Sequence, residues 1–121
     1  MALGTTISSL AQDKMMKEAP VKTIALEQIP GEFTQKQLTL NAGTYVFEIS
    51  NKNVGHDVGF VLVPKGKDIA DPDNHIQSAY VTKAVSDGMT QNSKPTILSK
   101  GEYYYFCPLN PTATDNVLMV K

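Results

Sequence analysis

The residue with the clearest chemical potential in this sequence is its single cysteine, Cys107. It follows an aromatic, strand-like run from Tyr103 to Phe106 and precedes a proline-rich loop. Upstream, the dipeptide Gly55-His56 lies between a turn and another apolar, strand-like segment. A thiolate and an imidazole on neighbouring strands are two of the ligands that copper prefers, so we predict that Cys107 and His56 bind a metal.

Length and charge exclude several classes of protein. The chain has 121 residues and a net charge of −1, with 11 basic and 12 acidic side chains. This length suits one domain that buries a core without disulfides. Because there is no basic stripe, we predict no nucleic-acid partner. Because no apolar run approaches the ~20 residues needed to cross a bilayer, we predict no membrane span.

Residues 1–20 are expected to be distinct from the rest of the chain. They could form a short helix, capped by Ser8 or Ser9 and stopped by Pro20, or a terminal arm. They lack the basic start and the unbroken apolar stretch of a secretory signal. The sequence therefore leaves open a cytosolic protein or an exported one whose signal is not present in this chain.

From residue 21 onward the sequence predicts β-structure. Short segments with alternating apolar residues recur between turn signals, at the spacing of a β-sandwich. The expected strands are 21–29, 33–40, 44–49, 57–63, 94–99, 102–106 and 116–121, with 57–63 apolar enough for a central strand. We predict an all-β sandwich over residues 21–121, with a short helical or irregular insertion around 67–92, in which residues 75–85 could form a short helix.

Three segments make this part of the chain resemble the cupredoxins, the Greek-key sandwich of blue-copper proteins. Residues 50–60 resemble the family's segment that supplies its first histidine ligand. Residues 96–107 are similar to the family's strand, glycine turn, aromatic strand and ligand cysteine, and 117–120 to its final strand. The resemblance covers residues 21–121 and implies a Greek-key β-sandwich.

The resemblance also implies a site and an activity. It implies copper as the cofactor, held by Cys107 and His56, with the backbone carbonyl of Gly55 as an axial contact. It further implies single-electron transfer with redox protein partners, a periplasmic or extracellular location, and no enzymatic activity. A rigid sandwich suits such a site because electron transfer requires nearly the same geometry in Cu(I) and Cu(II).

The loop after the cysteine departs from the family pattern. Residues 108–116 hold neither the second histidine nor the methionine usual there, and Asn110 stands where histidine is expected. Three interpretations stay open. A third donor comes from His75 or Met89, an open position takes water or an external ligand in a natural or engineered variant, or no metal binds.

Two functional hypotheses follow. The first is a copper-binding electron carrier, and the second is a copper chaperone or storage protein, or a metal-free binding module of cupredoxin type. The lone thiol also leaves open a thiol-linked or metal-linked dimer. A nucleophilic pair of Cys107 and His56 lacks any oxyanion hole or cleft signal. His75, in a turn-rich stretch, is expected to be exposed.

Overall fold

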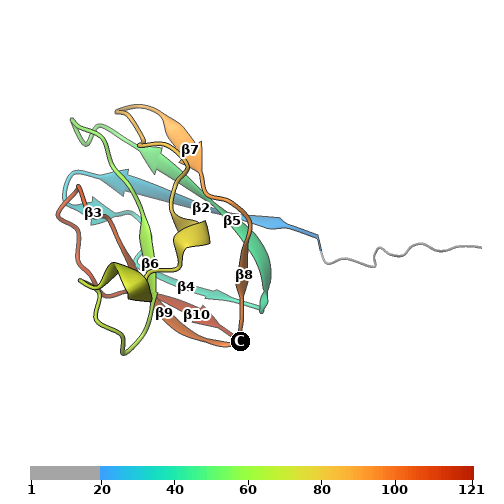
Figure 1. The fold of residues 1–121 in the computed structure, drawn as a ribbon. Coiled ribbons are helices and arrows are strands. Elements are labelled where there is room, and N and C mark those ends of the chain that lie inside the picture. Colours follow the sequence, from blue (N-terminus) through green and yellow to red (C-terminus); the bar gives the residue numbers. More distant parts are fainter. Residues whose placement is uncertain (1–19) are drawn as a thin grey trace, which may run out of the picture.

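The computed structural model describes residues 20–121, which form a sandwich of two β-sheets (Figure 1). Residues 1–19 of the expected helix or arm lie outside the described residues. One sheet has the order β4-β10-β9-β6 and the other β3-β2-β5-β7, with β8 also paired to β5. The strands are β2 (Lys22–Ile29), β3 (Glu32–Phe33), β4 (Gln37–Leu40), β5 (Gly43–Asn51), β6 (Val61–Pro64), β7 (Thr90–Asn92), β8 (Thr96–Leu98), β9 (Gly101–Phe106) and β10 (Asn116–Val120). The prediction of an all-β sandwich is confirmed.

Alternation of apolar and polar residues explains how the two sheets face each other. In β5 the buried side chains are Tyr45, Phe47 and Ile49, and in β9 they are Tyr103 and Tyr105. Side chains with a period of two lie on one face of a strand. The inward set of each strand therefore meets the other sheet.

An aromatic cluster fills the centre of the sandwich. The rings of Phe33 and Tyr105 meet edge to face with centroids 5.1 Å apart, and those of Phe47 and Phe60 lie 4.8 Å apart. All four side chains are buried. Aromatic rings bury large apolar areas and prefer such geometries. The cluster links β3, β5, β9 and the segment before β6.

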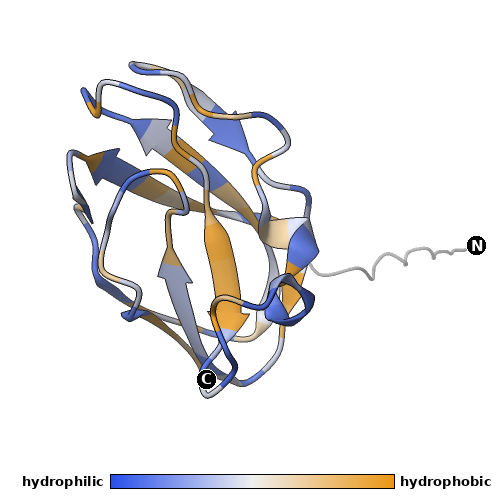
Figure 2. Ribbon diagram, turned by 60° about the vertical axis from the view of Figure 1, so that its left-hand side comes forward, coloured by the Kyte–Doolittle hydropathy of each residue, from blue (hydrophilic) through white to orange (hydrophobic). Residues whose placement is uncertain are grey.

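The strand β6 differs from its sequence-based expectation. Its residues are hydrophobic along the whole strand (Figure 2), and Val61, Leu62 and Val63 are all buried. We expected a central strand here, but β6 is an edge strand of its sheet. The insertion covers it, because the Ile76 N–H donates to the Leu62 carbonyl. The insertion therefore pairs with this edge of β6 in place of a neighbouring strand.

The insertion takes the irregular form of the two that were expected, and residues 75–85 do not form the helix that they could have formed. The insertion contains two 3₁₀ turns, η1 (Pro72–Asn74) and η2 (Gln77–Ala79), and is otherwise irregular. Val85 exchanges both backbone hydrogen bonds with Val58. These bonds extend the chain along the sandwich and compete with the i→i−4 bonds of a helix. Among residues 20–121, no helix has the length and hydropathy to cross a membrane.

We predict that Tyr105 makes stability fall at alkaline pH. Burial raises the pKa of its hydroxyl from 10.0 to about 12, and the hydroxyl donates to the Gln35 carbonyl at 2.6 Å. The unfolded chain ionises near pH 10 and the folded one near 12. The stabilisation is therefore complete below pH 10 and is lost between about pH 10 and 12.

Urea denaturation of the wild type and of Tyr105→Phe from pH 8 to 11.5 tests this prediction. The variant keeps the ring but has no hydroxyl to ionise, so its free energy of unfolding should fall less steeply above pH 10. At pH 8 it should lose about 0.5–1.5 kcal/mol with its hydrogen bond. Parallel pH profiles would show that Tyr105 does not carry the effect.

Candidate functional site

Cys107 follows β9 directly and begins the β9–β10 loop. Its side chain is 5% exposed. Three backbone N–H groups donate to its sulfur, from Gly59 at 3.3 Å, Leu109 at 3.4 Å and Asn110 at 3.1 Å. A thiol is a weak acceptor, and N–H donors complement an electron-rich sulfur best. The fold thus builds a polar cradle around its single thiol.

Asn110 fixes the loop that follows the cysteine. Its side chain is 1% exposed and makes three hydrogen bonds. The side-chain oxygen accepts from the Gly31 N–H at 2.8 Å, and the amide nitrogen donates to the Ile29 carbonyl at 2.9 Å and to Gln28 Oε1 at 3.2 Å. The loop is therefore tied to the end of β2 and the turn that leads to β3.

Gln28 completes a closed circuit of buried polar groups. Its Nε2 donates to the Gly59 carbonyl at 2.8 Å, while the Gly59 N–H donates to the sulfur of Cys107. Asn110 contacts both Gln28 and Cys107. We call Gln28, Gly59, Cys107 and Asn110 the polar ring. Since buried polar groups are costly unless paired, the ring is a strong constraint on this end of the sandwich.

His56 lies in an exposed loop organised by Asn51. The Asn51 amide donates to the His56 carbonyl at 2.7 Å and to the Val85 carbonyl at 3.0 Å. Gly55 has φ = +95°, a left-handed conformation that favours glycine. The His56 ring is exposed, and its Nδ1 lies 2.9 Å from the Asp57 carbonyl oxygen. The backbone of this loop is held firmly, while the imidazole faces solvent.

His75 is half-buried rather than exposed, so the expectation of an exposed side chain is wrong. Its Nδ1 lies 2.6 Å from the Tyr80 hydroxyl and its Nε2 lies 2.7 Å from the Ile69 carbonyl oxygen. Its ring also packs edge-on against Phe106, with centroids 6.2 Å apart. Both ring nitrogens are engaged within the insertion, so His75 secures this segment against β9.

The candidate donor Met89 is 53% exposed, in the loop before β7. Among residues 20–121, no group of three or more His, Cys, Asp or Glu side chains is arranged to hold a metal ion. Assignment of His56, Cys107 and Gly55 as ligands stays a prediction.

Comparison with known proteins defines the fold. No protein-family model and no curated protein matches the sequence. Among solved structures, the chain is similar to auracyanin B, with 23% identity and a TM-score of 0.68 over 86% of this chain and 91% of that one. Auracyanin A, a "blue" copper protein from Chloroflexus aurantiacus, is 18% identical, with a TM-score of 0.64 over 84% of this chain and 100% of that one. An auracyanin from Roseiflexus castenholzii is 17% identical, with a TM-score of 0.62 over 86% of this chain and 98% of that one. The chain has the cupredoxin fold.

The described residues of this chain do not fit a type 1 copper site. That site takes two imidazoles and one thiolate, with a weak axial donor. Asn110 stands at the position where the family resemblance places the second histidine. Its side chain makes all its hydrogen bonds to β2 and the following turn. His75 uses both ring nitrogens elsewhere. Of the ligands that such a site requires, the described residues therefore offer the thiol of Cys107 and the exposed imidazole of His56.

Sequence reasoning missed the residues that support this site. Gln28 follows Ile24 and Leu26 on the inward face of β2, and it is 0% exposed. The sequence did hold one signal of this burial, because Gln28 continues the alternation of Ile24 and Leu26 that points into the core. Asn51 occupies the same kind of position at the end of β5. Their partners come from segments far away in the sequence, so the individual hydrogen bonds could not be read from either strand.

We predict that Asn110→Ala strongly destabilises the protein. The change removes the partners of the Gly31 N–H and of two acceptors, the Ile29 carbonyl and Gln28 Oε1. Each buried group left unpaired costs about 1–3 kcal/mol, and we expect a total loss of about 3 kcal/mol. Thr114→Ala, at an exposed position of the same loop, is the matched control and should change stability by less than about 0.5 kcal/mol. Equal denaturation midpoints for the two variants would contradict the role of Asn110.

Proposed function

We propose that this protein is a metal-free binding module built on the cupredoxin fold. The observation that carries this proposal is the bonding of Asn110. In a type 1 site, the residue at this place turns a ligand atom toward the metal. Here the side chain turns to the end of β2 and the following turn, with all three hydrogen bonds inside the protein.

The surroundings of Cys107 support the same proposal. The polar ring holds the loop after Cys107 through hydrogen bonds within the protein. Proline on either side of Asn110 in the loop further restricts the backbone, at Pro108 and Pro111. A loop that is already rigid can present its exposed residues, such as Leu109, to a partner with little loss of entropy on binding.

Addition of Cu(II) tests the proposal. We expect no intense thiolate-to-copper absorption band, and a melting temperature unchanged by one equivalent of Cu(II). A strong visible band that disappears in Cys107→Ser would overturn the metal-free assignment. It would support the single-electron carrier that the family resemblance implies, with redox partners and a periplasmic or extracellular location.

A copper-handling role is the second candidate, and a specific observation favours it. One segment, residues 51–60, carries His56 and also supplies the Gly59 N–H that donates to the Cys107 sulfur. N–H donors at a cysteine sulfur are compatible with metal ligation, and a thiolate is a soft ligand suited to Cu(I). In this proposal Cys107 and His56 hold Cu(I), with the Gly55 carbonyl as a further contact, for delivery or storage.

Competition for Cu(I) against bicinchoninate, under anaerobic conditions, tests the second candidate. If it is right, Cys107→Ser removes binding and His56→Ala weakens it by about tenfold or more. His75→Gln is the matched histidine control and should keep the wild-type affinity. Equal affinities for the wild type and Cys107→Ser would exclude this role.

A further inference from the structure

The first half of β2 is an unpaired sheet edge among residues 20–121. The neighbouring strand β3 pairs only with Gln28 and Ile29. Glu27 accepts a hydrogen bond from Thr34 on the β3 side, and alternate residues direct their backbone groups to the same side of a strand. Thr23 and Ala25 therefore direct their N–H and C=O groups away from β5, where no described strand receives them.

The strand β4 is the facing edge of the other sheet. It pairs with β10 alone, and Leu40 accepts a hydrogen bond from the Lys121 N–H. By the same alternation, Gln37 and Thr39 direct their backbone groups to the opposite, free side. Two strand edges of this kind are templates for an added strand.

A groove of about 480 Å³ joins these two edges. This size falls within the range of ligand sites. Its lining includes the free edges at Thr23, Ala25 and Thr39. Four larger apolar residues also line it; they are Ile24, Leu38, Leu40 and Tyr45. The groove thus combines unpaired backbone groups with an apolar floor, the two elements that bind extended peptides.

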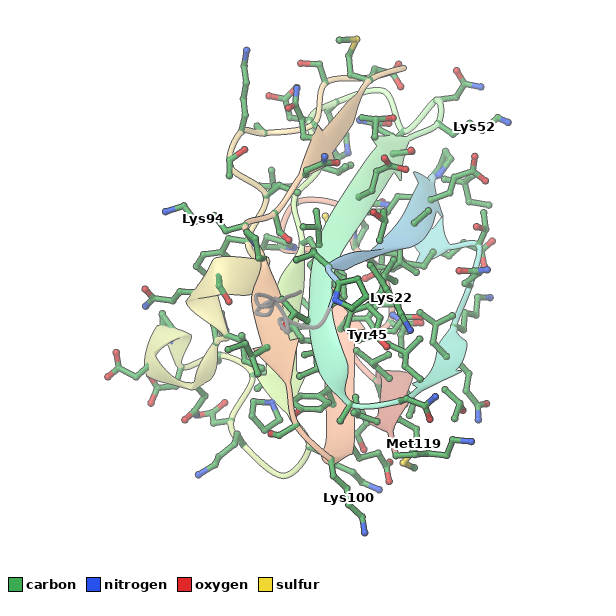
Figure 3. The ribbon with its side chains drawn as sticks, turned by 90° about the vertical axis from the view of Figure 1, so that its right-hand side faces the viewer. Lys22, Tyr45, Lys52, Lys94, Lys100 and Met119 are labelled. Atoms are coloured by element: carbon green, nitrogen blue, oxygen red, sulfur yellow. The ribbon has the colours of Figure 1, made fainter. Side chains whose placement is uncertain are left out.

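The charge of the groove identifies the chemistry of its partner. Lys22 and Lys121 both line it, and no Asp or Glu does. Figure 3 shows Lys22 and Tyr45 together on this side of the molecule, between β2 and β4. The groove is therefore cationic as well as apolar, and an acidic side chain on the partner complements it.

We propose that this groove binds an extended acidic peptide by strand addition. The peptide pairs with the Lys22–Ala25 edge of β2, in line with β3, and alternate apolar side chains enter the groove. An acidic side chain pairs with Lys22 or Lys121. The groove is lined by none of the residues of the polar ring, so the inference holds whatever the copper experiments show.

A labelled synthetic peptide tests the proposal on the full chain. The probe is an acetylated, amidated hexapeptide in which valine alternates with glutamate and threonine. We expect saturable binding by fluorescence anisotropy, with amide NMR shifts at Thr23, Ala25 and Thr39. The same peptide with lysine in place of glutamate, or with its pairing amides N-methylated, should bind about tenfold more weakly or not at all.

A matched pair of variants tests the pairing edge itself. Ala25→Pro removes an N–H that β5 does not use, and proline is tolerated at such edge positions. The control is Ala70→Val, at an exposed position outside the groove. We expect Ala25→Pro to weaken binding by about tenfold and Ala70→Val to keep the wild-type affinity. If Ala25→Pro does not fold, the comparison with the N-methylated peptide decides the question.

Several outcomes would overturn the inference. One is equal binding of the normal and N-methylated peptides, which would indicate apolar contact without strand addition. Another is a set of amide NMR shifts confined to the end of the sandwich that holds Cys107, which would place the peptide away from the groove. A third is self-association of the protein through the β2 edge in the absence of peptide, which would assign the groove to a second copy of this chain.

Discussion

The constraint on which this structure depends is the burial of polar groups at one end of the sandwich. The side chains of Gln28 and Asn110 and the sulfur of Cys107 lie out of contact with water, so each must find partners within the protein. They find them in one another and in the backbone of Gly59. Because these groups come from β2, the segment before β6 and the β9–β10 loop, the ring fixes how the two sheets meet at this end.

The same ring explains why the fold and the chemistry of this protein are separable. The loop after Cys107 is held against the end of β2 and the turn that follows it. Here hydrogen bonds from Asn110 perform that task, and Asn116 adds two more by donating to the carbonyls of Tyr105 and Ala113. A fold can therefore keep its architecture while its site changes, because the site is carried by a few side chains on a common framework.

The sequence was sufficient for the architecture, since the strands have clear periodicity and the order of the motifs is characteristic. Alternation of apolar residues over 44–49 predicted a strand there, and β5 confirms it. The insertion was harder: the pairing of Val58 with Val85 and the burial of His75 depend on contacts between distant segments. For the candidate site, the sequence indicated Cys107 and the loop after it, and their role as a site stays a prediction. The orientation of Asn110 was not, because an asparagine in a loop gives no sign of which distant backbone groups it will bind.

Burial of Cys107 has a further consequence for how this end of the molecule can be observed. An alkylating reagent reaches the sulfur only when the loop separates from its N–H donors, so the reaction proceeds through a local opening. Under conditions where reclosing is faster than modification, the labelling rate measures the free energy of that opening. As the single cysteine of the chain, Cys107 is thus a built-in reporter of the local stability of the loop, independent of global unfolding. A disulfide-linked dimer would have to pass through the same opening.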